Sequence, residues 1–197
     1  MTKAITLSAR VVLIMGPIMG LMSLMVSGIN SSAEARSRPA NVVKCPAEGR
    51  CEGTPAADTL KSGAGASQIY ALAGPDYALG TGKGEGIFMG RGDDTAIGRG
   101  GGDVIDGGSG DDDLDGGPGH DAVGGGPGKD TLVGGSGQDR MFAAESLGER
   151  PGANAQDEID AGGGRDICVV SKRDQHKGCE TVQSAKEYRE SVPGSQQ

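Results

Sequence analysis

The chain is poor in the residues that build ordinary protein cores. Its 197 residues include no Trp, two Phe and three Tyr, but 38 Gly. Each ordered glycine loses backbone entropy and contributes no side-chain contacts, so this composition argues against a large conventional core. The chain also has only two His and neither a Gly-x-Ser-x-Gly nor a His-Glu-x-x-His motif. We therefore expect a protein that is not an enzyme and whose fold is stabilised by something besides apolar burial, such as a bound metal.

Basic residues are outnumbered by acids, 19 to 27, which gives a formal net charge of −8. Aspartates dominate the middle of the chain, and its glycine-rich stretches carry Asp where a phosphate-binding loop carries Lys and Ser or Thr. Such a surface repels phosphate and argues against a nucleic-acid partner. A cation is the ligand that this charge favours.

Residues 1–35 have the pattern of an export signal. Lys3 and Arg10 precede a charge-free, mostly apolar run over 11–28, and a small-residue cleavage site ends at Ala35. The run is long enough for an uncleaved membrane anchor to be the alternative, but Gly and Pro interrupt it. We expect a secreted, extracellular protein without a membrane span after cleavage. Retention at the cell envelope is the alternative localisation.

Four cysteines fall into two close pairs, Cys45 with Cys51 and Cys168 with Cys179. An even number of cysteines in an exported chain favours disulfides. Four cysteines allow three connectivities, of which the pairing of near neighbours is the simplest. Neither spacing is Cys-x-x-Cys, which argues against a zinc site.

A nine-residue repeat organises residues 53–169. Residues 107–142 read as four consecutive copies: GGSGDDDLD, GGPGHDAVG, GGPGKDTLV and GGSGQDRMF. The register continues on both sides for a total of 117 residues, or thirteen nines without a slip. The sixth position is Asp or Glu in eleven copies, the eighth is apolar or Cys in twelve, and the fourth is Gly in nine. A disordered glycine-rich linker would not keep three columns in phase over this length.

Each nine has the composition of a turn followed by a short strand. The first six residues need tight turns, which glycine permits, and the last three form a minimal strand whose eighth side chain faces inward. Stacked copies would form parallel sheets around a thin core. The predicted core column is Leu60, Ile69, Ala78, Ile87, Ala96, Ile105, Leu114, Val123, Leu132, Met141, Ile159 and Cys168.

The stacked turns offer the oxygen ligands that calcium prefers. Turn carbonyls and one carboxylate from each sixth position are hard donors, and Ca²⁺ accepts six to eight of these in a flexible geometry. Mg²⁺ needs a stricter octahedron, and zinc prefers Cys or His. We therefore expect Ca²⁺ as the cofactor.

The repeat resembles the RTX, or haemolysin-type, calcium-binding nonapeptide family. The resemblance implies an all-β fold, a right-handed parallel β-roll in which two nines make one coil and ions lie between turns eighteen residues apart. It places Asp94, Asp112 and Asp130 on one edge and Asp103, Asp121 and Asp139 on the other, with about four good sites between residues 89 and 142. Asp76 and Glu85 would add poorer sites. The implied metal-binding glycines are Gly90, Gly92, Gly101, Gly108, Gly110, Gly117, Gly119, Gly126, Gly128, Gly135 and Gly137.

The segments outside the best repeats have separate predicted roles. Residues 36–52 form an N-terminal cap with the Cys45/Cys51 loop, and residues 53–142 form the roll, with its strongest repeats at 89–142. Residues 143–169 are degenerate last repeats, in which 143–151 lose the motif and are predicted to bulge out as a loop. Residues 170–197 are a polar C-terminal tail that we expect to fray.

The resulting hypothesis is an exported calcium-binding β-roll that folds on binding Ca²⁺. It is predicted to be a non-enzymatic structural or interaction module, with a protein or surface partner that the sequence does not specify. The alternative is an accessory or remnant domain of a secreted hydrolase or toxin. A roll that binds ice or polysaccharide would need a regular array on one face, and the seventh and ninth positions are irregular.

Overall fold

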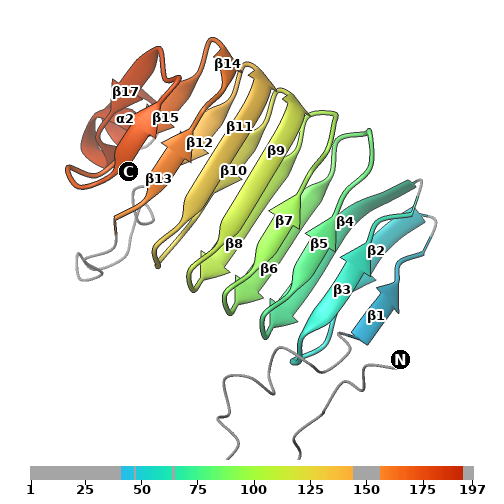
Figure 1. The fold of residues 1–197 in the computed structure, drawn as a ribbon. Coiled ribbons are helices and arrows are strands. Elements are labelled where there is room, and N and C mark those ends of the chain that lie inside the picture. Colours follow the sequence, from blue (N-terminus) through green and yellow to red (C-terminus); the bar gives the residue numbers. More distant parts are fainter. Residues whose placement is uncertain (1–40, 47, 64, 144–155, 193–197) are drawn as a thin grey trace, which may run out of the picture. The chain divides into compact units, whose positions relative to one another are not determined.

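Two parallel β-sheets face each other across one thin core. The computed structural model describes residues 41–46, 48–63, 65–143 and 156–192. Apart from β14, successive strands alternate between the sheets, so each coil of the chain adds one strand to each sheet (Figure 1). Sheet A consists of β1 (Asn41–Lys44), β3 (Asp58–Lys61), β5 (Tyr77–Leu79), β7 (Thr95–Ile97), β9 (Asp113–Gly119), β11 (Thr131–Gly137), β13 (Glu158–Asp160) and β16 (Gln175–Lys177), with β14 (Gly163–Gly164) also pairing with β11. Sheet B consists of β2 (Glu48–Glu52), β4 (Gly65–Ala73), β6 (Gly86–Arg91), β8 (Val104–Ser109), β10 (Ala122–Gly124), β12 (Arg140–Phe142), β15 (Ile167–Val169) and β17 (Thr181–Gln183).

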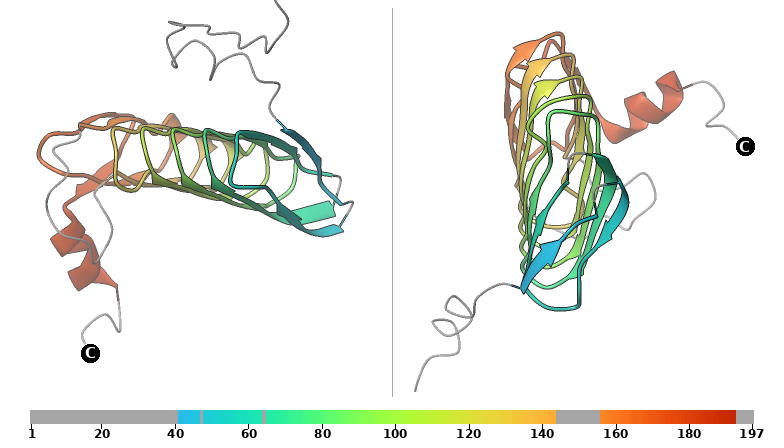
Figure 2. Two further views of the ribbon diagram at one scale, coloured as in Figure 1. Left: turned by 90° about the horizontal axis from the view of Figure 1, so that it is seen from below. Right: turned by 90° about the vertical axis from the view of Figure 1, so that its right-hand side faces the viewer.

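The strand register follows the repeat. In sheet A, Ala78 pairs with Ala96 and Ala96 with Leu114, which are steps of eighteen residues. All the strand pairings are parallel, and seen along its axis the coil is flattened (Figure 2). The fold is therefore the predicted right-handed parallel β-roll.

One nine-residue repeat is left out of the strand register. Leu132 pairs with Ile159 and Met141 with Cys168, which are steps of 27 residues instead of eighteen. The predicted bulge at 143–151 falls within this longer step. Residues 144–155 themselves lie outside the described part of the chain.

The predicted core column is confirmed, because all twelve of its side chains are buried between the two sheets. Met89 is also fully buried, at a first repeat position where most copies have glycine. Disulfides Cys45–Cys51 and Cys168–Cys179 are present, and Cys45, Cys51 and Cys168 extend the core at its two ends. Covalent links thus lie beside the first and last described coils.

The segment after Val170 differs from the expected frayed tail. It adds β16 and β17 to the two sheets and then forms the helix α2 (Ala185–Ser191). A capping box between Ser184 and Glu187 begins the helix, and Tyr188 packs edge-on against Phe142 of β12 at 5.3 Å between ring centroids. Strand pairing uses backbone groups, so it continues without the repeat motif. At the other end, β1 and β2 pair with β3 and β4 and add a coil before residue 53. Within the described residues, no helix has the length and apolarity needed to cross a membrane.

Arg99 provides a test of the turn conformation. It has φ = 77° at a second repeat position, where Gly90 and Gly108 have φ = 107° and 98°. A left-handed backbone costs a non-glycine residue about 1 kcal/mol, so Arg99→Gly is expected to raise the calcium-saturated melting temperature by about 2–4 °C. Arg91→Gly removes the same charge from an exposed strand residue without a positive φ, so it should lower the melting temperature or leave it unchanged. Equal effects of the two substitutions, measured by thermal denaturation, would contradict this interpretation.

Candidate metal sites

Buried carboxylates line both edges of the roll. Each comes from a sixth repeat position, directly before a strand or, for Asp58, at the first residue of one, and each is at most 4 % exposed. Edge A, where the turns enter sheet A, carries Asp58, Asp76, Asp94, Asp112, Asp130 and Asp157. Edge B, where the turns enter sheet B, carries Glu85, Asp103, Asp121, Asp139 and Asp166. The strand register therefore brings together the six aspartates predicted at 94–139, in two files of three.

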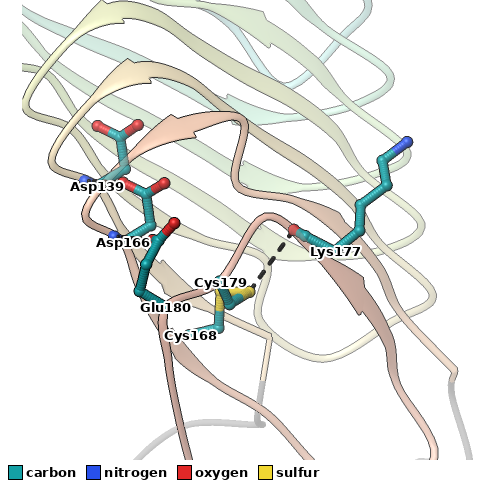
Figure 3. Close-up of a disulfide and its surroundings, with 6 residues drawn as sticks. All are labelled: Asp139, Asp166, Cys168, Lys177, Cys179 and Glu180. Carbon is teal, nitrogen blue, oxygen red and sulfur yellow. Dashed lines mark hydrogen bonds between the residues drawn. A yellow bond between two sulfur atoms is a disulfide. The ribbon is translucent and has the colours of Figure 1, made fainter.

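One oxygen of each aspartate in the files is held by the backbone of the previous coil. The N–H of Asp94 donates to Oδ1 of Asp112 at 2.9 Å, and the N–H of Asp103 donates to Oδ1 of Asp121 at 2.7 Å. The ladder continues across the longer step, where the N–H of Asp139 donates to Oδ1 of Asp166 at 2.9 Å. Figure 3 shows the end of this file, where the N–H of Asp166 donates to Oε2 of Glu180 beside the Cys168–Cys179 disulfide. These bonds fix how each carboxylate is oriented along its edge.

The second oxygen of most of these carboxylates has no protein partner. Oδ2 is buried without a hydrogen bond in Asp76, Asp94, Asp103, Asp112, Asp121, Asp130, Asp139 and Asp166, as is Oδ1 of Asp58. A buried carboxylate oxygen without a partner is costly, and repetition along both edges calls for one common compensating ligand. A cation between successive coils would provide it.

The first glycine of each turn lies where two kinds of oxygen converge. A Cβ built on Gly116 would lie 2.7 Å from Oδ2 of Asp121 and 2.9 Å from the carbonyl oxygen of Gly134 in the next coil. At Gly134 the corresponding distances are 3.0 Å to Oδ2 of Asp139 and 2.6 Å to the carbonyl oxygen of Ala161. In the described residues no three His, Cys, Asp or Glu side chains are placed so that they alone could hold a metal ion, so backbone carbonyls would have to complete a site. Carboxylates with carbonyls are a hard-oxygen set that fits calcium.

The comparison with known families agrees with this geometry. A family model described as the RTX calcium-binding nonapeptide repeat matches the chain in four copies, at residues 52–82, 90–123 and 124–145. Residues 52–145 therefore carry copies of the RTX calcium-binding nonapeptide repeat. Searches of curated proteins and of solved structures each found no match. The RTX match ends at residue 145, whereas the files of buried acids continue to Asp157 and Asp166.

The predicted ligand glycines all lie at the second or fourth position of a repeat, some of them in the last residues of a strand. Gly90, Gly92, Gly108, Gly110, Gly126 and Gly128 are on edge A, and Gly101, Gly117, Gly119, Gly135 and Gly137 are on edge B. Gly110 illustrates why the fourth position needs glycine: its φ is 132°, and a Cβ there would collide with the carbonyl oxygen of Gly92 in the previous coil. The carbonyls of these turns therefore stack closely from coil to coil. Their binding to a metal stays a prediction.

The outer RTX positions divide into stronger and weaker candidates. Asp76 has the same unpartnered Oδ2 as the central aspartates. Glu85 differs, because its longer side chain folds back so that both oxygens accept hydrogen bonds from the N–H and the hydroxyl of Thr81. Asp58 and Asp166 were not among the predicted ligands, although they share the sixth position and each has a buried oxygen without a partner, Oδ1 in Asp58 and Oδ2 in Asp166. The position in the repeat was the signal that could have identified them.

Seven of the buried RTX aspartates have raised pKa values. Burial raises the pKa of Asp76, Asp112 and Asp130 to about 7 and that of Asp103 to about 6. The hydrogen bond from the previous coil lowers each pKa, and neighbouring carboxylates of the same file raise it. Burial is also the largest cause of the raised pKa of Asp94, Asp121 and Asp139, and a nearby carboxylate raises each further: Asp93 for Asp94, Asp139 for Asp121 and Asp166 for Asp139. A fully ionised file is therefore unfavourable without a counter-ion.

Proposed function

We propose that this protein is an exported calcium-binding β-roll that folds when it binds Ca²⁺ and serves as a non-enzymatic structural or interaction module. The observation that carries the proposal is the double file of six buried aspartates between positions 94 and 139, each with one oxygen held by the previous coil and the other without a partner. Bound calcium would supply the missing positive charge and link neighbouring coils. The match to the RTX repeat supports the choice of this ion.

The central turns are the best candidates for the sites. On edge A, Asp112 lies between Asp94 and Asp130, and on edge B, Asp121 lies between Asp103 and Asp139. If each pair of neighbouring turns holds one ion, the six aspartates form about four sites. Turn carbonyls of the glycines listed above would complete the coordination.

Export is supported by two features of the chain. Residues 1–35 have the charge pattern, apolar run and cleavage motif of a signal peptide. Both disulfides join cysteines close in sequence, and such bonds persist in oxidising compartments outside the cytosol. In the described residues all strands belong to the roll, which supports a module whose work is done by its surface.

Substituting the central aspartates tests the proposed sites. Asp112→Asn and Asp121→Asn keep an oxygen that can accept the hydrogen bond from the previous coil but remove the charge. Because each of these residues borders two sites, each substitution is expected to reduce the calcium stoichiometry by about two, or to weaken those sites at least about tenfold. Isothermal titration calorimetry with Ca²⁺ and with Mg²⁺ measures the effect.

Asp113→Asn is the matched control, because Asp113 is the next residue in the chain and its side chain is exposed on the outer face of β9. It should leave calcium binding unchanged. The proposal fails if the wild-type protein shows no calcium-specific heat, or if the substitutions at 112 and 113 have the same effect.

A further inference from the structure

A groove of about 440 Å³ lies on edge B beside the turns that enter β8, β10 and β12. Three of the edge-B aspartates, Asp103, Asp121 and Asp139, contribute to its lining. The groove also gathers polar and cationic side chains from three successive turns, namely His120, Gln138, Arg140 and Arg165. Sites for small organic ligands have volumes of about 300–1,000 Å³, so the groove has room for one.

The two arginines of the groove are available to a ligand. Arg140 and Arg165 are both exposed, and neither forms an ion pair with any residue that the structure describes. Unpaired cations gathered in one groove are unexpected in a chain of net charge −8. A guanidinium presents a planar fork of N–H donors that matches the oxygens of a carboxylate, sulfate or phosphate group.

The column of fifth repeat positions distinguishes edge B from edge A. On edge B, Nδ1 of His120 accepts the backbone N–H of Gln138 at 2.7 Å, which leaves Nε2 as the donor of the neutral ring. On edge A the corresponding column is acidic: Asp93 accepts the N–H of Asp111, and Asp111 accepts the N–H of Lys129. The same backbone arrangement therefore carries His120 and Gln138 on edge B where edge A carries the carboxylates of Asp93 and Asp111.

Calcium would make the two edges electrostatically different. Three carboxylates and two calcium ions on edge B leave a formal charge of about +1, and Arg140 and Arg165 raise it to about +3. Without calcium the same groups total about −1, which would disfavour an anion. On edge A, loaded in the same way, Asp93 and Asp111 offset Arg91 and Lys129, so the formal charge is about +1, against about +3 on edge B.

We propose that the edge-B groove is a calcium-dependent binding site for a small organic oxyanion, meaning a carboxylate, sulfate or phosphate group carried on an apolar body. Arg140 and Arg165 bind the oxyanion, and His120 and Gln138 offer further polar contacts. The apolar body packs against Val104, Ala122 and Ile167 on the sheet-B side of the groove. This inference rests on the proposed function, because the bound ions convert the groove from a negative to a positive site.

Thermodynamic linkage provides the test, because an anion that binds only the calcium-loaded form must raise the apparent calcium affinity. Calcium titrations of the full chain are made with and without 10 mM 4-toluenesulfonate, a probe that stays ionised and does not chelate calcium, with ionic strength matched by NaCl. We expect the probe to raise the apparent calcium affinity of the wild type about twofold to fivefold. In parallel, NMR should show shifts of the Gln138 and Arg140 amides in the calcium-loaded protein.

Variants on the two edges localise the effect. Arg140→Gln combined with Arg165→Gln should abolish the linkage and the amide shifts while leaving calcium binding intact without the probe. The matched control, Arg91→Gln combined with Lys129→Gln, removes two charges from edge A and should keep both effects. If the double edge-B variant loses calcium binding, the single Arg165→Gln decides, and it should weaken the linkage at least twofold.

Each other outcome overturns a specific statement. Calcium binding without any probe effect in the wild type rejects the groove but leaves the proposed function standing. The absence of calcium binding rejects the proposed function and the groove together. Equal effects of neutral 4-methylbenzyl alcohol would show that no oxyanion is recognised, and equal effects of inorganic sulfate would show that no organic body is.

Discussion

Excess chelator at pH 8 is expected to abolish most of the β-sheet circular dichroism of this protein, and added calcium is expected to restore it. The ion-free fold buries carboxylates one above another along both edges, and eight aspartates there have an Oδ2 with no partner. The core that opposes this repulsion is a single column of side chains between two sheets. Its burial is too small to compensate for two files of like charge in a medium of low dielectric constant.

Magnesium at the same concentration is the control for this experiment. Its smaller radius and strict octahedral geometry fit poorly with carbonyls and carboxylates on a flexible turn, so it should restore little of the signal. The coupling of folding to calcium would be refuted by a sheet signal that persists in chelator at pH 8 with a cooperative thermal transition.

Acidification is expected to act in opposite directions on the ion-free and calcium-loaded forms. Burial raises the pKa of Asp76, Asp112 and Asp130 to about 7, so the folded state binds more protons than the unfolded state. Stability from such groups is fully present below the unfolded pKa of about 3.9 and is lost as the pH rises through about 7. In chelator, part of the sheet signal should therefore return on going from pH 8 to pH 5.

Calcium binding should weaken over the same interval, because each site needs ionised carboxylates and protons compete with the ion. We expect the apparent affinity at pH 5 to be at least about tenfold lower than at pH 8. Calorimetry and circular dichroism at matched ionic strength measure both effects. A calcium affinity that does not change between pH 5 and 8 would mean that the raised pKa values do not describe the binding residues.

The fold and the two files of aspartates could be predicted from the sequence, because both depend on the constant nine-residue interval of the repeat. A constant interval of nine puts Asp94, Asp112 and Asp130 on one edge and the eighth-position side chains in the core, whatever occupies the variable positions. The register of Ala78, Ala96 and Leu114 follows from the same arithmetic. Backbone pairing outside the repeat gave no such signal, which is why β1, β2, β16 and β17 could not be predicted.

Side-chain conformation was also beyond the sequence. Nothing in the motif indicates that Oδ1 of Asp121 accepts a hydrogen bond from the coil before it. Nor does it indicate that Thr81 donates hydrogen bonds to both carboxylate oxygens of Glu85. The groove at Arg140 and Arg165 joins residues 25 positions apart across the longer coil, so the repeat register alone does not place them together. Such features depend on which rotamers the neighbouring coils allow.

The step of 27 residues between Leu132 and Ile159 shows how a two-edged repeat tolerates changes of length. A single nine added to the strand register would move every later turn to the opposite edge of the roll. Asp157 would then follow Asp139 on edge B, and Arg165 would move to edge A, away from Arg140. Because one nine is left out of the strand register, every later turn stays on the edge that it occupies now. Among insertions that stay in the strand register, only whole coils of eighteen residues would leave every later turn on its own edge.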